Sequence, residues 1–161
     1  MDLEHFTDLD EKLAVGSYPH TPDHVQFLRD TAGVGAVLNL QSDVDLRTRG
    51  IDWTIMWPLY TRMGVLTTRV PILDFTPLDL AKQLDKAVDA VKTFQTKGRK
   101  VYVHCNAGLN RSPSVVIAHL VASRSLSVEK ATVWLEERHD CVPYPDVLNA
   151  WAQRHGYPLE G

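Results

Sequence analysis

The stretch VYVHCNAGLNRSPSVVIAHLVASR, residues 101–124, is the most informative part of the sequence. Its first three residues, Val101, Tyr102 and Val103, are of the β-branched and aromatic types that favour a buried strand. Residues 111–124 are apolar nearly all round, which predicts a central helix buried on every side. The intervening loop carries one cysteine, Cys105, so the stretch predicts a strand, a tight loop and a helix in immediate succession.

Strands and helices alternate on both sides of this stretch. Apolar runs predict strands at residues 13–15, 34–40 and 67–73, the last at a sheet edge because it contains Pro71. Helical periodicity and boundary residues predict helices at residues 22–30, 78–97, 128–138 and 146–155. Residues 41–50 are polar and are expected to be irregular. This order predicts an α/β fold with a central, largely parallel sheet flanked by helices.

The composition is that of one globular domain, which we expect to span residues 1–161. The chain is 44% hydrophobic and 23% charged, and it shows no internal repeat and no Gly/Ser/Pro-rich linker. A net charge of −3 is not typical of a nucleic-acid-binding surface, so no nucleic acid is expected as a partner. The longest apolar stretch, residues 115–122, is too short to span a bilayer, so no membrane is expected either.

The two cysteines bear on the compartment. They cannot form a disulfide framework, which favours a reducing environment. The first five residues, MDLEH, are acidic and lack the apolar run of a signal peptide, so we expect a cytoplasmic protein. The chain is also expected to be a monomer. Cys141 lies close to two prolines, where a structural role is expected; a disulfide with Cys105 is the alternative.

The loop after Cys105 has the features of an anion-binding cradle. A tight loop at a helix N-terminus can aim several backbone N–H groups at one point, and the helix dipole adds partial positive charge there. Gly108 and Asn110 tolerate the unusual dihedral angles that such a loop needs. The planar guanidinium of Arg111 can bind two phosphate oxygens. The residues expected to bind phosphate are Asn106, Ala107, Gly108, Leu109, Asn110 and Arg111.

The same loop predicts nucleophilic catalysis by Cys105. A thiol that faces a helix N-terminus and a guanidinium loses its proton easily, so a thiolate could attack the bound phosphate and form a cysteinyl-phosphate intermediate. His104 is expected to point away from the cradle and to orient the loop, and Ser112 to donate a hydrogen bond to the thiolate. This chemistry needs no metal and no cofactor. The alternative is a buried, unreactive cysteine beside a helix.

The pattern His104-Cys105-x5-Arg111-Ser112 resembles the signature loop of the cysteine-dependent protein tyrosine phosphatase superfamily, in its dual-specificity branch. The resemblance implies a general acid, an aspartate placed about thirty residues before the cysteine. Asp74 lies thirty-one positions before Cys105, at the end of a predicted strand, and is our candidate. Asp79 is the competitor, but it falls within a helical pattern, where a solvated or capping role is expected.

A wider resemblance points to a subgroup of these phosphatases. Similarity to the plant starch-excess and laforin-type glucan phosphatases extends over residues 13–17, 22–23, 37–41, 50–52, 74–78 and 101–109. It implies removal of phosphate from starch- or glycogen-like glucans, with Phe75 contacting the glucan chain. The chain departs from this subgroup at Asn110, where glycine is usual, and at Ser112, where the plant members have alanine. No carbohydrate-binding module is expected in this chain.

Three aromatic residues between two predicted strands could also bind sugar. Trp53, Trp57 and Tyr60 are expected near the rim of the active site, where flat rings can stack on sugar faces. Trp57 is the candidate substrate-binding residue among them. The alternative is that Trp53 and Trp57, four residues apart, form an apolar pair that faces the core.

Other substrates and roles remain open at this point. A phosphoprotein phosphatase acting on phosphotyrosine, phosphoserine or phosphothreonine would use the same loop. A phosphoinositide phosphatase is less favoured, because such enzymes generally carry lysines in this loop and Asn106, Ala107, Leu109 and Asn110 are uncharged. A non-catalytic phosphate-recognition module usually lacks the nucleophile or the arginine, and both are present here.

Overall fold

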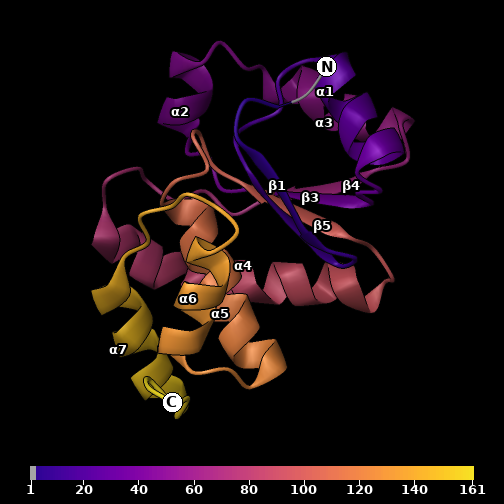
Figure 1. Ribbon diagram of the computed structural model, residues 1–161. Helices are drawn as coiled ribbons and strands as arrows, with labels where there is room; N and C mark the ends of the chain where they lie inside the picture. Colours follow the sequence, from indigo (N-terminus) through magenta and orange to yellow (C-terminus); the bar gives the residue numbers. More distant parts are fainter. Residues whose placement is uncertain (1–2) are drawn as a thin grey trace.

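The computed structural model describes residues 3–161 and has a five-stranded sheet at its centre (Figure 1). The strand order is β1-β2-β5-β3-β4. β1 pairs antiparallel with β2, and all other neighbours pair in parallel. The strands are β1 (Phe6–Asp10), β2 (Leu13–Gly16), β3 (Ala36–Asn39), β4 (Leu66–Arg69) and β5 (Val101–His104). The expected α/β fold with a largely parallel sheet is confirmed.

Helices cover both faces of this sheet. Figure 1 shows α1 and α3 on one face and α4, α5, α6 and α7 on the other, with α2 near one end of the strands. The helices are α1 (Pro22–Gln26), which continues into the π-helix η1 (Phe27–Thr31), α2 (Asp43–Thr48), α3 (Trp53–Arg62), α4 (Pro77–Thr96), α5 (Arg111–Arg124), α6 (Val128–Glu136) and α7 (Pro145–His155). Within residues 3–161, no helix has both the length and the apolar character needed to cross a bilayer.

The central strand β5 shows how the sheet separates two hydrophobic cores. Val101 and Val103 belong to the larger core with α4 to α7, whereas Tyr102 belongs to the smaller core with α1, η1 and α3. Because successive side chains of a strand point to opposite faces, a strand buried on both faces reads as a continuous apolar run. The central helix α5 is buried along most of its length, as its composition predicted.

Several elements differ from the sequence expectations. Residues 41–50 were expected to be irregular, but Asp43–Thr48 forms α2, which begins with a capping box between Ser42 and Asp45. The strand expected at residues 67–73 ends at Arg69, before Pro71, and lies at the sheet edge. β1 and α3 were not predicted; α3 carries Pro58 in its interior, which obscures its helical pattern. Met1 and Asp2, part of the segment considered for a signal peptide, lie outside the described residues.

Candidate active site

The loop between β5 and α5 lies at the carboxyl end of the central strand, as predicted from residues 101–124. Gly108 in this loop has φ of 75°, and a Cβ placed on it would come within 2.5 Å of the backbone carbon of Gly16. Only glycine therefore fits here without moving the end of β2. Asn110, also expected to have unusual dihedral angles, has φ of −128° and ψ of −67°, outside both the helical and the extended regions. Its side chain donates to the Val142 carbonyl oxygen at 2.6 Å.

Cys105 lies buried at the start of this loop, between two predicted supporting residues. Its Sγ is 3.3 Å from the Ser112 Oγ, so the hydroxyl is placed to donate a hydrogen bond to a thiolate. The buried His104 lies on the preceding strand, and its Nδ1 donates to the Cys105 carbonyl oxygen at 3.0 Å. Burial lowers the pKa of His104 to about 4, so this ring is neutral near neutral pH. His104 thus contacts the backbone of the loop.

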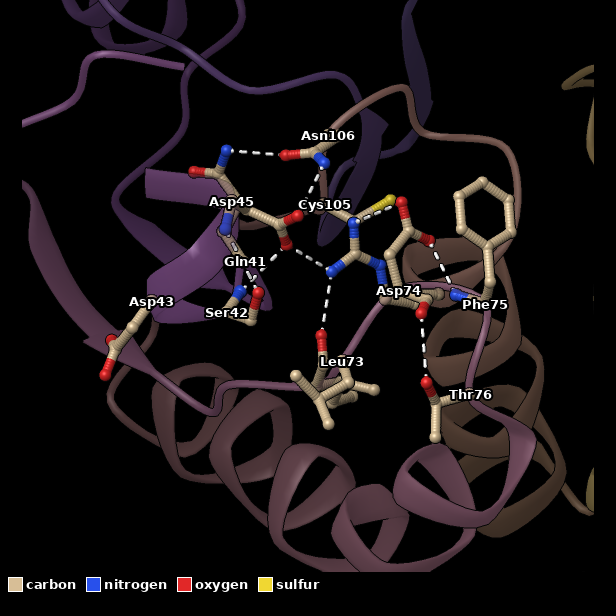
Figure 2. A network of polar contacts seen from close by, with 12 residues as sticks. Gln41, Ser42, Asp43, Asp45, Leu73, Asp74, Phe75, Thr76, Cys105 and Asn106 are labelled. Carbon is tan, nitrogen blue, oxygen red and sulfur yellow. Dashed lines mark hydrogen bonds and ion pairs between the residues drawn. The ribbon is translucent and has the colours of Figure 1, made fainter. Parts of the chain in front are cut away.

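Arg111 occupies the first position of α5 and is only 1% exposed at its side chain. Its Nη1 donates to the Asp45 Oδ2 at 2.6 Å and to the Ile72 carbonyl oxygen at 2.8 Å. Its Nη2 lies 3.2 Å from the Asp74 Oδ2 (Figure 2). Two carboxylates from different parts of the chain therefore hold one guanidinium beside Cys105.

Asp45 is a site residue that the sequence reasoning missed. Its carboxylate accepts hydrogen bonds from Arg111, from the Ser42 N–H at 2.9 Å and from the Asn106 Nδ2 at 2.9 Å. Burial opposes ionisation, but these partners outweigh it and hold the pKa of Asp45 below its usual value. The spacing Ser42-x-x-Asp45 is a capping-box pattern, and it could have indicated a helix and a fixed carboxylate here.

The candidate acid Asp74 lies on the segment between β4 and α4, where its side chain is 28% exposed. Its Oδ1 accepts from the Phe75 N–H at 3.1 Å, and Phe75 has a φ of 56°, a strained conformation for a bulky residue. The Phe75 side chain stands beside Asp74 (Figure 2), and the residue is 86% exposed. Asp79 instead accepts from the Leu73 N–H at 2.7 Å near the start of α4. The structure therefore brings Asp74 to Arg111 and gives Asp79 a backbone-holding contact.

The three aromatic residues of α3 do not form one surface. Trp57 is 51% exposed, so it does not make the core pair with Trp53 that was the alternative. Trp53 is half-buried against the smaller core, with the Arg69 guanidinium 5.7 Å from its ring centre. Tyr60 is buried in that core, so the expectation that it lies at the rim is wrong. Figure 1 shows α3 beside α1 over the sheet face, away from α2.

Both cysteines are free thiols, so the disulfide considered for Cys141 and Cys105 is not formed. Burial, with smaller contributions from Glu136 and Asp140, raises the pKa of the Cys141 thiol to about 11.

Residues 15–149 match the family model described as dual specificity phosphatase, catalytic domain. The chain belongs to the dual specificity phosphatase family. As the family implies, this is a cysteine-dependent phosphatase domain. The expectation drawn from His104-Cys105-x5-Arg111-Ser112 is confirmed at the level of the family.

Two curated relatives carry names that state different activities. The Arabidopsis thaliana protein named phosphoglucan phosphatase LSF1, chloroplastic, is 31% identical over 147 residues, covering 91% of this chain and 24% of that protein. Human dual specificity protein phosphatase 12 is 34% identical over 110 residues, covering 68% of this chain and 28% of that protein. The chain thus spans about a quarter of the length of these relatives.

The solved structures agree with the fold. The crystal structure of PTPMT1 in complex with PI(5)P matches with a TM-score of 0.79 and 24% identity, covering 95% of this chain and 96% of that chain. At this identity, the likeness concerns the fold alone.

Proposed function

We propose that this dual specificity phosphatase domain hydrolyses phosphomonoesters through Cys105, Arg111 and Asp74, and that its substrate is a phosphorylated glucan. The observation that carries the catalytic assignment is the Arg111 guanidinium, held at the N-terminus of α5 between Asp45 and Asp74 and beside the thiol. Backbone N–H groups of residues 106–111 complete an anion site without a metal.

The first chemical step transfers the phosphoryl group to sulfur. The phosphate of the substrate takes the place of the Asp74 carboxylate on the Arg111 Nη2, which is 3.2 Å away in the structure. The Cys105 thiolate attacks phosphorus, the bond from phosphorus to the ester oxygen breaks, and Asp74 donates a proton to that oxygen.

The second step restores the enzyme. Asp74, now a carboxylate, takes a proton from a water molecule that attacks phosphorus, and the phosphorus–sulfur bond breaks to release orthophosphate. The Ser112 hydroxyl, 3.3 Å from the Cys105 Sγ, stabilises the departing thiolate by hydrogen bonding. Cys105→Ser removes the nucleophile, so it should abolish turnover while it retains anion binding.

The glucan assignment rests on one residue and one relative. Phe75 presents an almost fully exposed ring beside Asp74, in a strained conformation that favours a function over a packing role. Such a ring can stack on a sugar that continues beyond the phosphate. The similar Arabidopsis protein is named a phosphoglucan phosphatase. The half-exposed Trp57 stays a candidate for a more distant sugar contact.

A phosphoprotein substrate is the second candidate, favoured by the similarity to human dual specificity protein phosphatase 12. Ser112 favours it too, because serine is common at this position in general dual-specificity phosphatases. The deciding experiment offers phosphoglucan, phosphopeptides and a small aryl phosphate to one preparation without added metal. Orthophosphate release from phosphoglucan supports the proposal. Rapid turnover of phosphopeptides with none of phosphoglucan contradicts it.

The compartment and the assembly are also proposals. We infer one phosphatase domain over residues 1–161, and we infer a cytoplasmic location from the cysteine argument of the sequence. For the assembly, we propose a monomer. Light scattering of the purified chain and the location of a fluorescent fusion test these two statements.

A further inference from the structure

We propose that His139 is a positioning residue of the phosphate loop, holding the peptide between Gly108 and Leu109 so that the Leu109 N–H faces the substrate phosphate. The inference rests on the proposed phosphate-binding role of residues 106–111. His139 follows α6 and is thirty-one positions from Gly108, yet its Nε2 lies 2.7 Å from the Gly108 carbonyl oxygen.

The loop is held from outside through its carbonyl oxygens. Three of them accept hydrogen bonds from parts of the chain other than β5, the loop and α5: Asn106 from the Tyr18 N–H at 3.1 Å, Gly108 from the His139 Nε2 at 2.7 Å, and Leu109 from the Val142 N–H at 2.6 Å. His139 is the side-chain donor among these three, and the other two are backbone groups.

These contacts fix the direction of the loop amides. The described residues contain no cis peptide bond, and in a trans peptide the N–H points opposite to the carbonyl of the same peptide unit. The carbonyls of Asn106, Gly108 and Leu109 point toward their donors in the surrounding chain. The N–H groups of the same three peptides, which belong to residues 107, 109 and 110, therefore point away from these donors. An anion at the N-terminus of α5 needs N–H groups with this orientation.

Among the loop peptides, the one that follows Gly108 depends most on a hydrogen-bond donor to its carbonyl oxygen. Glycine adopts many backbone conformations at low cost, so this peptide can rotate more easily than its neighbours. Gly108 is buried, and a carbonyl without a partner there would be driven to rotate toward water. The His139 side chain prevents that rotation by giving the carbonyl a partner on the outside.

The His139 ring is itself fixed in one tautomer. A carbonyl oxygen only accepts, so the Nε2 must carry the hydrogen, and the Nδ1 then accepts from the Thr7 hydroxyl at 2.7 Å. Burial, aided by the neighbouring His5, lowers the pKa of His139, which favours this neutral form. The His5 ring stacks on His139 with 4.1 Å between ring centres, and its Nε2 lies 3.0 Å from the Asp140 carbonyl oxygen. Strand β1 thereby holds the ring through Thr7.

The test measures anion binding separately from stability. Inorganic phosphate is titrated calorimetrically into Cys105→Ser protein, alone and with His139→Leu, His139→Gln or Thr7→Val added. The same three changes are made in the active enzyme for aryl phosphate kinetics. His119→Leu is the matched control, because His119 is another buried histidine, but its Nε2 lies 3.4 Å from the Ser123 Oγ on its own helix and not near the loop.

We expect His139→Leu to weaken phosphate binding and lower kcat/KM by about tenfold or more, since a misdirected amide is lost from the cradle. His139→Gln, whose amide can still donate, should recover part of both, and Thr7→Val should cause a smaller loss of the same kind. His119→Leu should lower the melting temperature and leave phosphate affinity in place.

Two results would overturn the proposal, and they are distinguishable. If Cys105→Ser protein does not bind phosphate at all, the proposed function of the loop fails and the role of His139 fails with it. If that protein binds phosphate with the same affinity in every His139 and Thr7 variant while only melting temperatures change, His139 merely packs. Should His139→Leu fail to fold, unchanged affinity in both His139→Gln and Thr7→Val overturns the proposal in the same way.

Discussion

Replacing Asp45 by asparagine separates two roles that its contact with Arg111 could serve. The change removes the charge but keeps the shape, so α2 and its capping box have little steric reason to move. An asparagine oxygen can still accept from Arg111 and from the Ser42 N–H. Its NH2 group, however, meets the Asn106 Nδ2, which now donates to the carboxylate at 2.9 Å.

The expected loss of stability follows from the burial of the ion pair between Arg111 and Asp45. The Arg111 side chain is 1% exposed and that of Asp45 10%, so the guanidinium cannot replace its lost partner by water. Breaking a buried ion pair costs about 3–5 kcal/mol, and the oxygen that remains should bring the loss to about 3 kcal/mol. For a chain of this size, that loss corresponds to a melting temperature lower by about 6–12 °C. Since Arg111 would also be less well placed, kcat should fall about 10- to 100-fold.

The assay is aryl phosphate hydrolysis at a temperature well below unfolding, with a melting curve for each protein. Phosphoglucan and aryl phosphate should be affected equally, because Arg111 contacts the phosphate that they share. Ser42→Ala is the control: it removes the capping hydroxyl, keeps the carboxylate, and should cost about 1 kcal/mol of stability with a much smaller loss of kcat.

An unchanged kcat with a lower KM would refute this reasoning. That result would mean that Asp45 only opposes the negative charge of the phosphate and does not position Arg111.

The pH dependence of the free energy of unfolding is a second measurement of the role of the Asp45 charge. The folded pKa of Asp45 lies below its unfolded value, so its stabilisation is present above that unfolded pKa and is lost as the pH falls through the folded one. The Asp45→Asn variant should lack this loss of stability at acidic pH.

Three further predictions concern other residues. Asp74→Asn should slow the hydrolysis of phosphoglucan more than that of aryl phosphate, because the aryl leaving group needs less protonation. Equal slowing of both substrates, together with a larger loss of activity in Asp79→Asn, would indicate that Asp79 is the general acid. Phe75→Ala should lower kcat/KM for phosphoglucan about fivefold or more and for aryl phosphate less, with little change in melting temperature because the residue is 86% exposed; equal losses would contradict sugar stacking. Burial lowers the pKa of His119 from 6.5 to about 4, so the unfolded chain takes up the proton first and stability falls as the pH drops from 6.5 toward 4. At about pH 5 this loss is about 2 kcal/mol, and denaturant unfolding of His119→Gln should show a shallower pH dependence; the wild-type slope in that variant would argue against it.

The strand, loop and helix of residues 101–124 could be predicted from the sequence because each depends on neighbours in the chain. Three local properties indicated these elements: the apolar run of β5, the apolar residues on all sides of α5, and the glycine at position 108. The structure shows the strand, the buried helix and a positive φ at Gly108. The long helix α4 was also predictable, since its apolar positions recur with the helical period over 20 residues.

The sequence did not predict the short helices α2 and α3, because their local patterns were weak or contradictory. The six residues of α2 carry few apolar side chains, and their helix depends on the cap formed by Ser42 and Asp45. In α3, Pro58 argues against a helix, yet packing of Met56 and Tyr60 in the smaller core favours it. Tertiary burial outweighed local propensity there, and it moved Tyr60 from the expected rim into the core.

From the sequence alone, one local motif pointed to the residues that we propose for the chemistry, Cys105, Arg111 and Ser112. The contacts that hold these residues came from the tertiary structure. The order β2-β5-β3 places the ends of β2 and β3 on either side of the loop after β5, which brings Asp45 to Arg111 from far along the chain. The turn after α6 brings His139 to Gly108 in the same way. A local pattern cannot encode such contacts, because they depend on which strands lie side by side in the sheet and on how the helices pack against it.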